Sequence, residues 1–176
     1  MTIGKVAYAA LFVVVLPVGL VLWAGRLDAY LPLTVPDATV MGLAVAALGA
    51  TCMVWATAAL WQHGRGLPMS PYPPAQFVTT GIYGLVSHPI YLGAVLLSAG
   101  ASLAWRSPGG LWVVTPMLAA AATAWVLGFE ASATRNRFGP RAEPPRLHLP
   151  PAIEDAPAVW DRVSVFALVL LPWLLG

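Results

Sequence analysis

The sequence predicts an all-α fold: a polytopic helical membrane protein with four spans and a candidate fifth at the C-terminus. Hydrophobic residues make up 59% of the 176 residues and charged residues only 9%, whereas a soluble domain carries about 25% charged residues to solvate its surface. Eight Trp and five Tyr suit a chain with two membrane–water interfaces, where amphipathic rings concentrate. The composition therefore indicates a surface that faces lipid.

Four apolar runs approach or reach the length of about 20 residues that a helix needs to cross a bilayer. The first contains Pro17, which a membrane helix tolerates, and is closed by Arg26 and Asp28. A short turn at residues 106–110 joins the third and fourth runs, which are therefore predicted to form an antiparallel hairpin. The four predicted spans cover residues 6–25, 38–61, 89–105 and 111–129.

The last apolar run, residues 163–176, has only 14 residues. A helix of that length rises about 21 Å, less than the ~30 Å hydrocarbon core. Three interpretations stay open: a span that begins further back near Ala158, a re-entrant or interfacial segment, or a chain cut inside a span. The end at Gly176 lacks a polar closing residue, as expected for a chain with a missing C-terminal domain.

Composition also excludes several classes of function. A formal net charge of +2 gives no basis for a nucleic-acid partner. The single cysteine, Cys52, excludes an internal disulfide framework and a multi-cysteine metal site. The three histidines, His63, His88 and His148, are too far apart for ligand-like spacing, so no metal site is predicted.

Basic residues set the predicted orientation. With the N-terminus in the cytoplasm, only Arg26 and Arg106 lie in outside loops, whereas seven lie inside, which is a clear positive-inside bias. Residues 62–88 and 130–162 then share the cytoplasmic face of a bacterial inner membrane, and we look for chemistry there. The seven inside residues are Lys5, Arg65, Arg135, Arg137, Arg141, Arg146 and Arg162.

His88 stands at the predicted start of the third span, directly before Pro89. Because proline is favoured in the first helical turn, His88 is expected at the helix N-terminus, where backbone N–H groups and the helix dipole favour an anion. Tyr91 follows one turn later on the same face, and Tyr83 precedes both. The alternative is an interfacial anchor, since aromatic residues are common at membrane surfaces.

Glu130 stands at the cytoplasmic end of the fourth span. Ionisable residues at membrane depth are costly and are candidates for function, although a solvated helix end is the alternative. An arginine-rich stretch follows. It suits either contact with an anionic leaflet or bidentate binding of a carboxylate, and its arginines are Arg135, Arg137, Arg141 and Arg146.

Two motifs stand out in this region. The first is carried by Gly66-Leu67-Pro68, Pro73-Pro74, Thr80-Gly81-Ile82-Tyr83 and Ser87-His88-Pro89-Ile90-Tyr91-Leu92-Gly93. The second motif is formed by Glu130 and, at the matching spacing, Phe138-Gly139. Together they resemble membrane methyltransferases of the isoprenylcysteine carboxyl methyltransferase type and their relatives, the phospholipid N-methyltransferases. The resemblance covers about residues 60–150.

The resemblance implies a cofactor and a reaction. S-adenosylmethionine would bind at the cytoplasmic end of the last two spans and donate a methyl group to a lipidic or prenylated substrate, by carboxyl O-methylation or amine N-methylation. The residues implied to bind the cofactor are Tyr83, His88, Tyr91, Leu92 and Glu130. Those implied to act in catalysis are Glu130 and Arg146, with the arginine positioning a substrate carboxylate.

The same resemblance divides the chain into three parts. Residues 1–61 hold two transmembrane helices, residues 62–150 a methyltransferase-like core of cytoplasmic loop, helical hairpin and cytoplasmic tail, and residues 151–176 a linker with a partial or final transmembrane helix. Ser87 stands where the family has arginine, and Ala131 where it has a second glutamate. These departures favour an alternative: a catalytically degenerate membrane subunit with a protein partner, or a fused module of a larger protein.

Overall fold

The computed structural model describes residues 7, 10–64, 78–139 and 147. Within these residues the regular elements are helices, several of which continue through short π-helical segments labelled η. In chain order they are η1 (Leu11–Val15), α2 (Leu16–Asp28), α3 (Thr39–Ala59), η2 (Leu60–Gly64), α4 (Ile82–Leu85), α5 (Pro89–Ala104), η3 (Gly110–Val114), α6 (Thr115–Trp125), η4 (Val126–Glu130) and α7 (Ala131–Phe138).

Among the described residues, three continuous helices are long and apolar enough to cross a membrane: Leu11–Asp28, Thr39–His63 and Gly110–Glu130. The predicted all-α membrane fold is confirmed, but the predicted count of four spans is corrected, because the third predicted span forms a shorter apolar helix, Pro89–Ala104. The helix α5 has only 16 residues, or about 24 Å of rise. It is short because it begins at Pro89 and stops at Ala104, before Arg106 turns the chain with a φ of 56°. The predicted fifth run lies outside the described residues.

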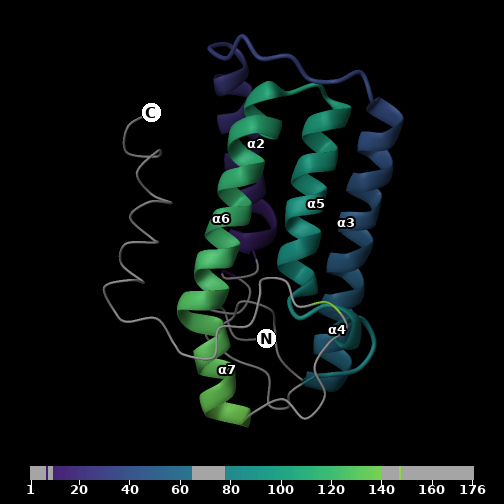
Figure 1. The fold of residues 1–176 in the computed structure, drawn as a ribbon, viewed down its shortest axis with the longest axis vertical. Coiled ribbons are helices and arrows are strands. Elements are labelled where there is room, and N and C mark those ends of the chain that lie inside the picture. The colour runs from purple at the N-terminus through teal and green to yellow at the C-terminus, as the bar shows by residue number, and fades with distance from the viewer. Residues whose placement is uncertain (1–6, 8–9, 65–77, 140–146, 148–176) are drawn as a thin grey trace.

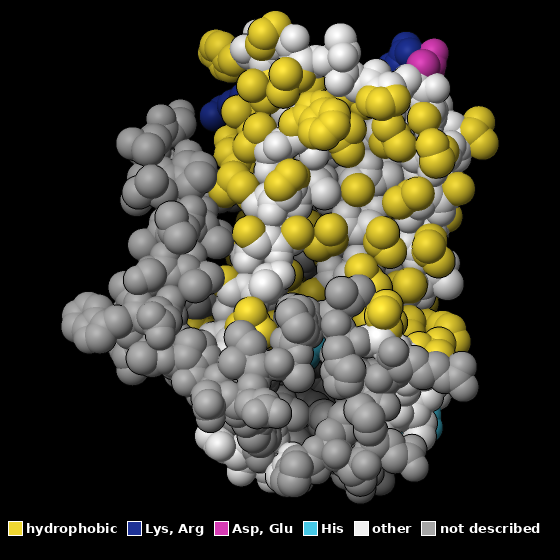
Figure 2. Space-filling model, viewed as in Figure 1, with side chains coloured by type: hydrophobic (Ala, Val, Ile, Leu, Met, Phe, Trp, Pro, Cys, Tyr) yellow, Lys and Arg dark blue, Asp and Glu magenta, His cyan; other side chains and the backbone are white. Residues whose placement is uncertain are grey.

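The helix α5 occupies the middle of the bundle, between α3 and α6 (Figure 1). Hydrophobic side chains cover much of the face that Figure 2 shows, over these three helices. The described Lys, Arg, Asp and Glu side chains visible there gather near the end where α5 joins η3. This distribution is that of a helical bundle whose sides meet lipid.

Glycines let α3 and α5 pack with their backbones in close approach. A Cβ atom built on Gly42 would lie 2.8 Å from the carbonyl oxygen of Gly100, and one built on Gly49 would lie 2.6 Å from that of Gly93. The pairing of Gly42 with Gly100 and of Gly49 with Gly93 makes the two helices antiparallel. Small residues are the usual means of close helix packing in a membrane, where lipid is as apolar as leucine. The packing fixes the position at which α5 begins.

The turn between α5 and η3 is tied to the end of α2 by one carboxylate. Asp28 Oδ1 accepts hydrogen bonds from Ser107 Oγ at 2.9 Å and from the Gly109 backbone N–H at 2.7 Å. Because the Gly109 N–H lies at the start of a helix, the carboxylate also meets the positive end of the helix dipole. Asp28 therefore holds α2 against the hairpin.

Replacing Asp28 with alanine is expected to lower the free energy of unfolding by about 1–2 kcal/mol, because a helix cap and a charge-assisted hydrogen bond are lost together. Unfolding of the purified protein in an SDS titration measures the change. Asp37→Ala is the matched control, since its ion pair with Arg106 is exposed and worth less than about 1 kcal/mol. Equal losses in the two variants would contradict the role of Asp28.

Candidate active site

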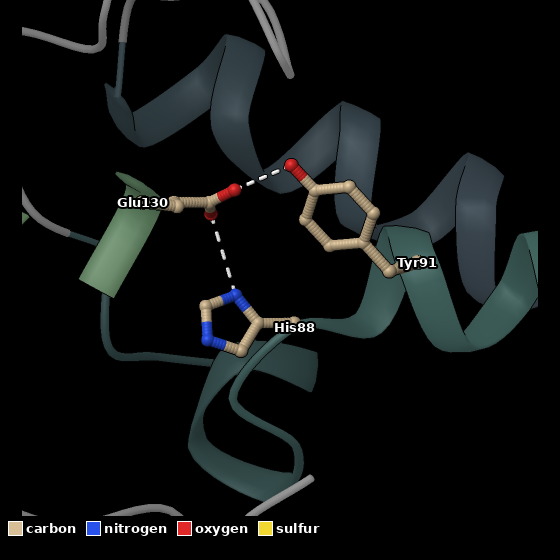
Figure 3. Close-up of polar contacts among 3 residues, drawn as sticks. All are labelled: His88, Tyr91 and Glu130. Atoms are coloured by element: carbon tan, nitrogen blue, oxygen red, sulfur yellow. Dashed lines mark hydrogen bonds and ion pairs between the residues drawn. The ribbon is translucent and has the colours of Figure 1, made fainter. Parts of the chain in front are cut away.

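His88, Tyr91 and Glu130 meet at the end of the bundle opposite the α5–η3 turn (Figure 3). His88 directly precedes α5, Tyr91 lies in its first turn, and Glu130 is the last residue of η4. His88 Nδ1 lies 3.3 Å from Glu130 Oε1, and the Tyr91 hydroxyl donates a hydrogen bond to Glu130 Oε2. One carboxylate thus joins the two sequence motifs.

The local sequence explains how His88 reaches this position. Gly81 has a φ of 63°, a left-handed conformation that favours glycine, and it leads the chain into the short helix α4. The segment after α4 is extended at Val86, and the buried Pro89 opens α5. The His88 carbonyl accepts the Leu92 N–H at 3.2 Å, so the imidazole is attached to the first turn of a fixed helix.

Tyr83 lies on α4 beside the same carboxylate. Burial, and then the charge of Glu130, raise the pKa of the Tyr83 phenol well above its ordinary value. Both causes disfavour the phenolate. Tyr83 therefore keeps its proton throughout the physiological range and can serve as a hydrogen-bond donor.

A backbone contact in the segment directly before His88 was not predicted from the sequence. The Leu147 N–H donates to the Leu85 carbonyl at 2.9 Å, and the Ser87 N–H donates to the Leu147 carbonyl at 3.3 Å, which forms an isolated parallel bridge between Val86 and Leu147. Ser87 Oγ is buried and has no hydrogen-bond partner in the part of the chain that the structure describes. A single bridge has no periodic pattern, so no sequence signal could have found it.

The structure brings some of the predicted site residues together, and one of them lies outside the described residues. His88, Tyr91 and Glu130 are brought into contact, and Tyr83 lies close enough to Glu130 for its pKa to respond to that charge. Leu92 follows Tyr91 in α5 and is half-buried. Arg146 lies outside the described residues, so its predicted role stays a prediction.

The arrangement can do two kinds of chemistry. A carboxylate at the end of an apolar bundle can hold a cationic group, and the imidazole and phenol groups beside it can form hydrogen bonds. Among the described residues, no group of three or more His, Cys, Asp or Glu could hold a metal ion. The carboxylate, imidazole and phenol groups of the site offer cation binding and hydrogen bonding.

Replacing Tyr91 with phenylalanine is expected to reduce any activity that depends on Glu130 by about tenfold, because a hydrogen bond to a charged group is worth about 1.5 kcal/mol or more. Turnover and SDS unfolding, measured side by side, separate a loss of positioning from a loss of fold. Tyr30→Phe is the control, since Tyr30 is exposed at the far end of α2. Turnover by Tyr91→Phe equal to that of the control would show that the hydroxyl plays no part.

A family model described as phospholipid methyltransferase matches residues 38–141, more than half of the chain. The match begins at the start of α3 and ends after α7, so it contains every residue of the contact between His88, Tyr91 and Glu130. No curated protein and no solved structure gave a match. The resemblance predicted from the two motifs is confirmed: the chain belongs to the phospholipid methyltransferase family.

Proposed function

We propose that the protein is an S-adenosylmethionine-dependent methyltransferase that acts on a lipidic or isoprenylated substrate at the cytoplasmic face of the membrane. The observation that carries the proposal is the double contact of Glu130, whose two carboxylate oxygens meet His88 and Tyr91. This contact joins the two motifs on which the family resemblance rests. The N-terminus lies in the cytoplasm, in line with the positive-inside bias.

The described residues suit a cofactor of this kind. The Glu130 carboxylate complements its positive charge, and the rings of Tyr83 and Tyr91 suit cation–π contact and stacking. His88 and Leu92 complete the proposed pocket. When bound, S-adenosylmethionine supplies a methyl group on a positively charged sulfur, and methyl transfer bonds that carbon to the acceptor while the carbon–sulfur electron pair stays on sulfur.

The main task of the protein is then to align the cofactor with the methyl acceptor. Holding two reactants in a reactive geometry contributes several kcal/mol to a rate, provided that the groups around them are fixed in advance. Here Glu130 is fixed by two contacts, and α5 is fixed by the backbone packing of its glycines against α3. The site is therefore organised before substrate arrives.

The position of the site supports a lipidic substrate. It stands at one end of a bundle whose sides carry apolar side chains (Figure 2), so a lipid can approach through the bilayer with its headgroup at the level of His88 and Glu130. For a carboxyl acceptor, Arg146 is the residue proposed to position the carboxylate, because arginine binds carboxylates in bidentate pairs.

Transfer of a radioactive methyl group tests the proposal. The protein is reconstituted in phosphatidylcholine vesicles that carry either phosphatidylethanolamine or farnesylcysteine, with methyl-tritiated S-adenosylmethionine. Label is expected in the extracted acceptor of at least one vesicle set. No label above empty vesicles in either set would contradict the proposal and favour the alternative, a degenerate membrane subunit.

A further inference from the structure

We propose that Trp125 and Phe129 form the surface that holds the hydrocarbon chain of the methyl acceptor beside Glu130, and that this aromatic pair selects acceptors by their chains. The inference rests on the proposed function and adds to it two specificity-determining residues. Neither belongs to the cofactor pocket proposed above, because both side chains are exposed on the helix that carries Glu130.

The two rings form one continuous surface. Trp125 is the last residue of α6, and Phe129 lies one turn later in η4. Their ring centroids are 5.3 Å apart and their planes differ by 26°, which is a favourable stacked arrangement of aromatic side chains. Rings that already hold each other lose little freedom when a chain packs on them. The aromatic pair is therefore organised before a substrate arrives.

This surface lies on the lipid side of a helix that can cross the membrane, Gly110–Glu130. In the last turns of that helix, Ala124 and Val126 are buried against the bundle. By contrast, Trp125 is 39% exposed and Phe129 is 42% exposed. A hydrocarbon chain can therefore reach both rings directly from the bilayer.

The π-helical segment η4 brings Glu130 to the same side of the helix as the aromatic pair. Glu130 follows Trp125 by five positions. In an α-helix five residues turn by about 500°, so the two side chains would point about 140° apart. A π-helix pairs residue i with residue i+5, which places them about one turn apart on one side. The carboxylate and the aromatic pair are therefore neighbours along one helix face.

The aromatic pair is continuous with the candidate active site. Phe129 directly precedes Glu130, so their Cα atoms are about 3.8 Å apart, and the Glu130 side chain is itself 34% exposed. A headgroup held at Glu130 has its first chain carbons beside Phe129. A chain that continues along the helix into the bilayer then passes Trp125, one turn deeper.

The contribution of such a surface is position, not burial from water. The tails of bilayer lipids are as apolar as the side chains that they meet, so a chain gains little from leaving its neighbours. Contacts with a non-reacting part of a substrate can instead align the reacting part, and their loss then lowers turnover. Methyl transfer depends on that alignment. The aromatic pair is therefore expected to act on acceptors that carry a chain.

The alternative is an interfacial anchor, since aromatic residues are common at membrane surfaces. Trp112, at the opposite end of the same helix, is 51% exposed and fits that role. An anchor contacts whichever lipid is present, whereas the proposed surface is occupied by the acceptor. Competition between the acceptor and bulk lipid therefore distinguishes the two roles.

Photocrosslinking of the reconstituted parent measures this competition. The phosphatidylcholine vesicles carry phosphatidylethanolamine with a diazirine in one acyl chain, or farnesylcysteine with a diazirine in its prenyl chain, and mass spectrometry maps the adducts. With at least one probe, adducts at Trp125 and Phe129 are expected to decrease when the unlabelled acceptor is added, and to persist when the same amount of phosphatidylcholine is added. Adducts at Trp112 are expected to respond equally to both additions.

Trp125→Ala and Phe129→Ala test the consequence for turnover. Turnover on the acceptor that the parent methylates is expected to fall about tenfold in each variant, which corresponds to about 1.4 kcal/mol. Affinity for S-adenosylmethionine, from equilibrium dialysis, is expected to stay within about threefold of the parent, or less than 1 kcal/mol. Trp125→Phe keeps a ring that can stack on Phe129 and is expected to retain most of the turnover. Trp112→Ala is the control.

Three results would overturn the inference while the proposed function stands. These are adducts at the aromatic pair that respond equally to acceptor and phosphatidylcholine, equal losses of cofactor affinity and turnover in the alanine variants, and turnover in those variants equal to that of Trp112→Ala. Absence of label transfer by the parent is a different outcome, because it would contradict the proposed function. Competed adducts would then assign the surface to a membrane subunit that binds the same lipid without methylating it.

Discussion

Replacing Gly100 with leucine is expected to force α3 and α5 apart and to lower the free energy of unfolding by about 3 kcal/mol, the upper end of the usual range for overpacking. A Cβ atom at residue 100 would lie 2.3 Å from the backbone nitrogen of Ala46 and 2.6 Å from the carbonyl oxygen of Gly42. Both atoms belong to the backbone of α3, so no side-chain rotation can relieve the clash.

Unfolding in an SDS titration measures this effect, and Gly19→Leu is the matched control. Gly19 also lies in an apolar helix, but a Cβ atom there would have nothing within 4 Å. Helix content from circular dichroism, recorded with both variants, shows whether α5 itself persists when its packing is lost. Equal stability of the two variants would show that the close approach of α3 and α5 does not hold the bundle together.

Replacing Glu130 with alanine is expected to give the largest functional loss, at least 100-fold in turnover together with a weaker affinity for the cofactor. The substitution removes the acceptor of the Tyr91 hydroxyl and the partner of His88 Nδ1 at once. Each hydrogen bond to a charged group contributes about 1.5–3 kcal/mol. Loss of the carboxylate is therefore expected to lower turnover by an order of magnitude or more for each contact.

Turnover and cofactor affinity are measured with Glu130→Gln beside Glu130→Ala, because glutamine keeps one accepting oxygen while it removes the charge and replaces the second oxygen with an NH2 donor. A glutamine variant that falls between alanine and the parent would separate hydrogen bonding from charge. Asp37→Ala controls for the loss of one carboxylate at the far end of the bundle, where Asp37 pairs with Arg106. If Glu130→Ala has the same turnover as Asp37→Ala, Glu130 has no role in the site.

Much of the fold could be predicted from composition because the bilayer imposes simple requirements. An apolar run of sufficient length must form a helix to satisfy its backbone, and the sequence His88-Pro89 marks where α5 begins. The predicted end of α5, near Trp105, lies one residue beyond the observed end. Trp105 is apolar and extends the hydrophobic run, but the helix ends at Ala104, and Arg106 then takes a left-handed conformation.

The contact partners of the helices could not be predicted from the sequence alone. Gly42 and Gly49 are seven residues apart, as are Gly93 and Gly100, and this spacing places each pair on one face of a helix. The spacing does not say which helix each face meets, because that depends on the whole bundle. Only the structure shows that the two glycine pairs meet each other.

The candidate site was predicted in part. The residues before and within the first turn of α5 could be singled out by type and position, and the link to Glu130 came from the family resemblance instead of from spacing. Tyr91 and Glu130 are 39 positions apart in the sequence, and no periodicity in that segment would bring the two together. The pairing of Leu147 with the chain before His88 was missed for the same reason, since long-range contacts depend on tertiary packing.

Equilibrium binding of labelled S-adenosylmethionine to the purified parent and to Glu130→Ala is the most direct test of a cofactor pocket built from His88, Tyr91 and Glu130. Such a pocket predicts saturable binding at one site per chain in the parent, and an affinity at least tenfold weaker in the variant, as loss of about 1.4 kcal/mol implies. Absence of saturable binding by the parent up to about 1 mM, the upper end of common substrate affinities, or equal binding by both proteins, would contradict it.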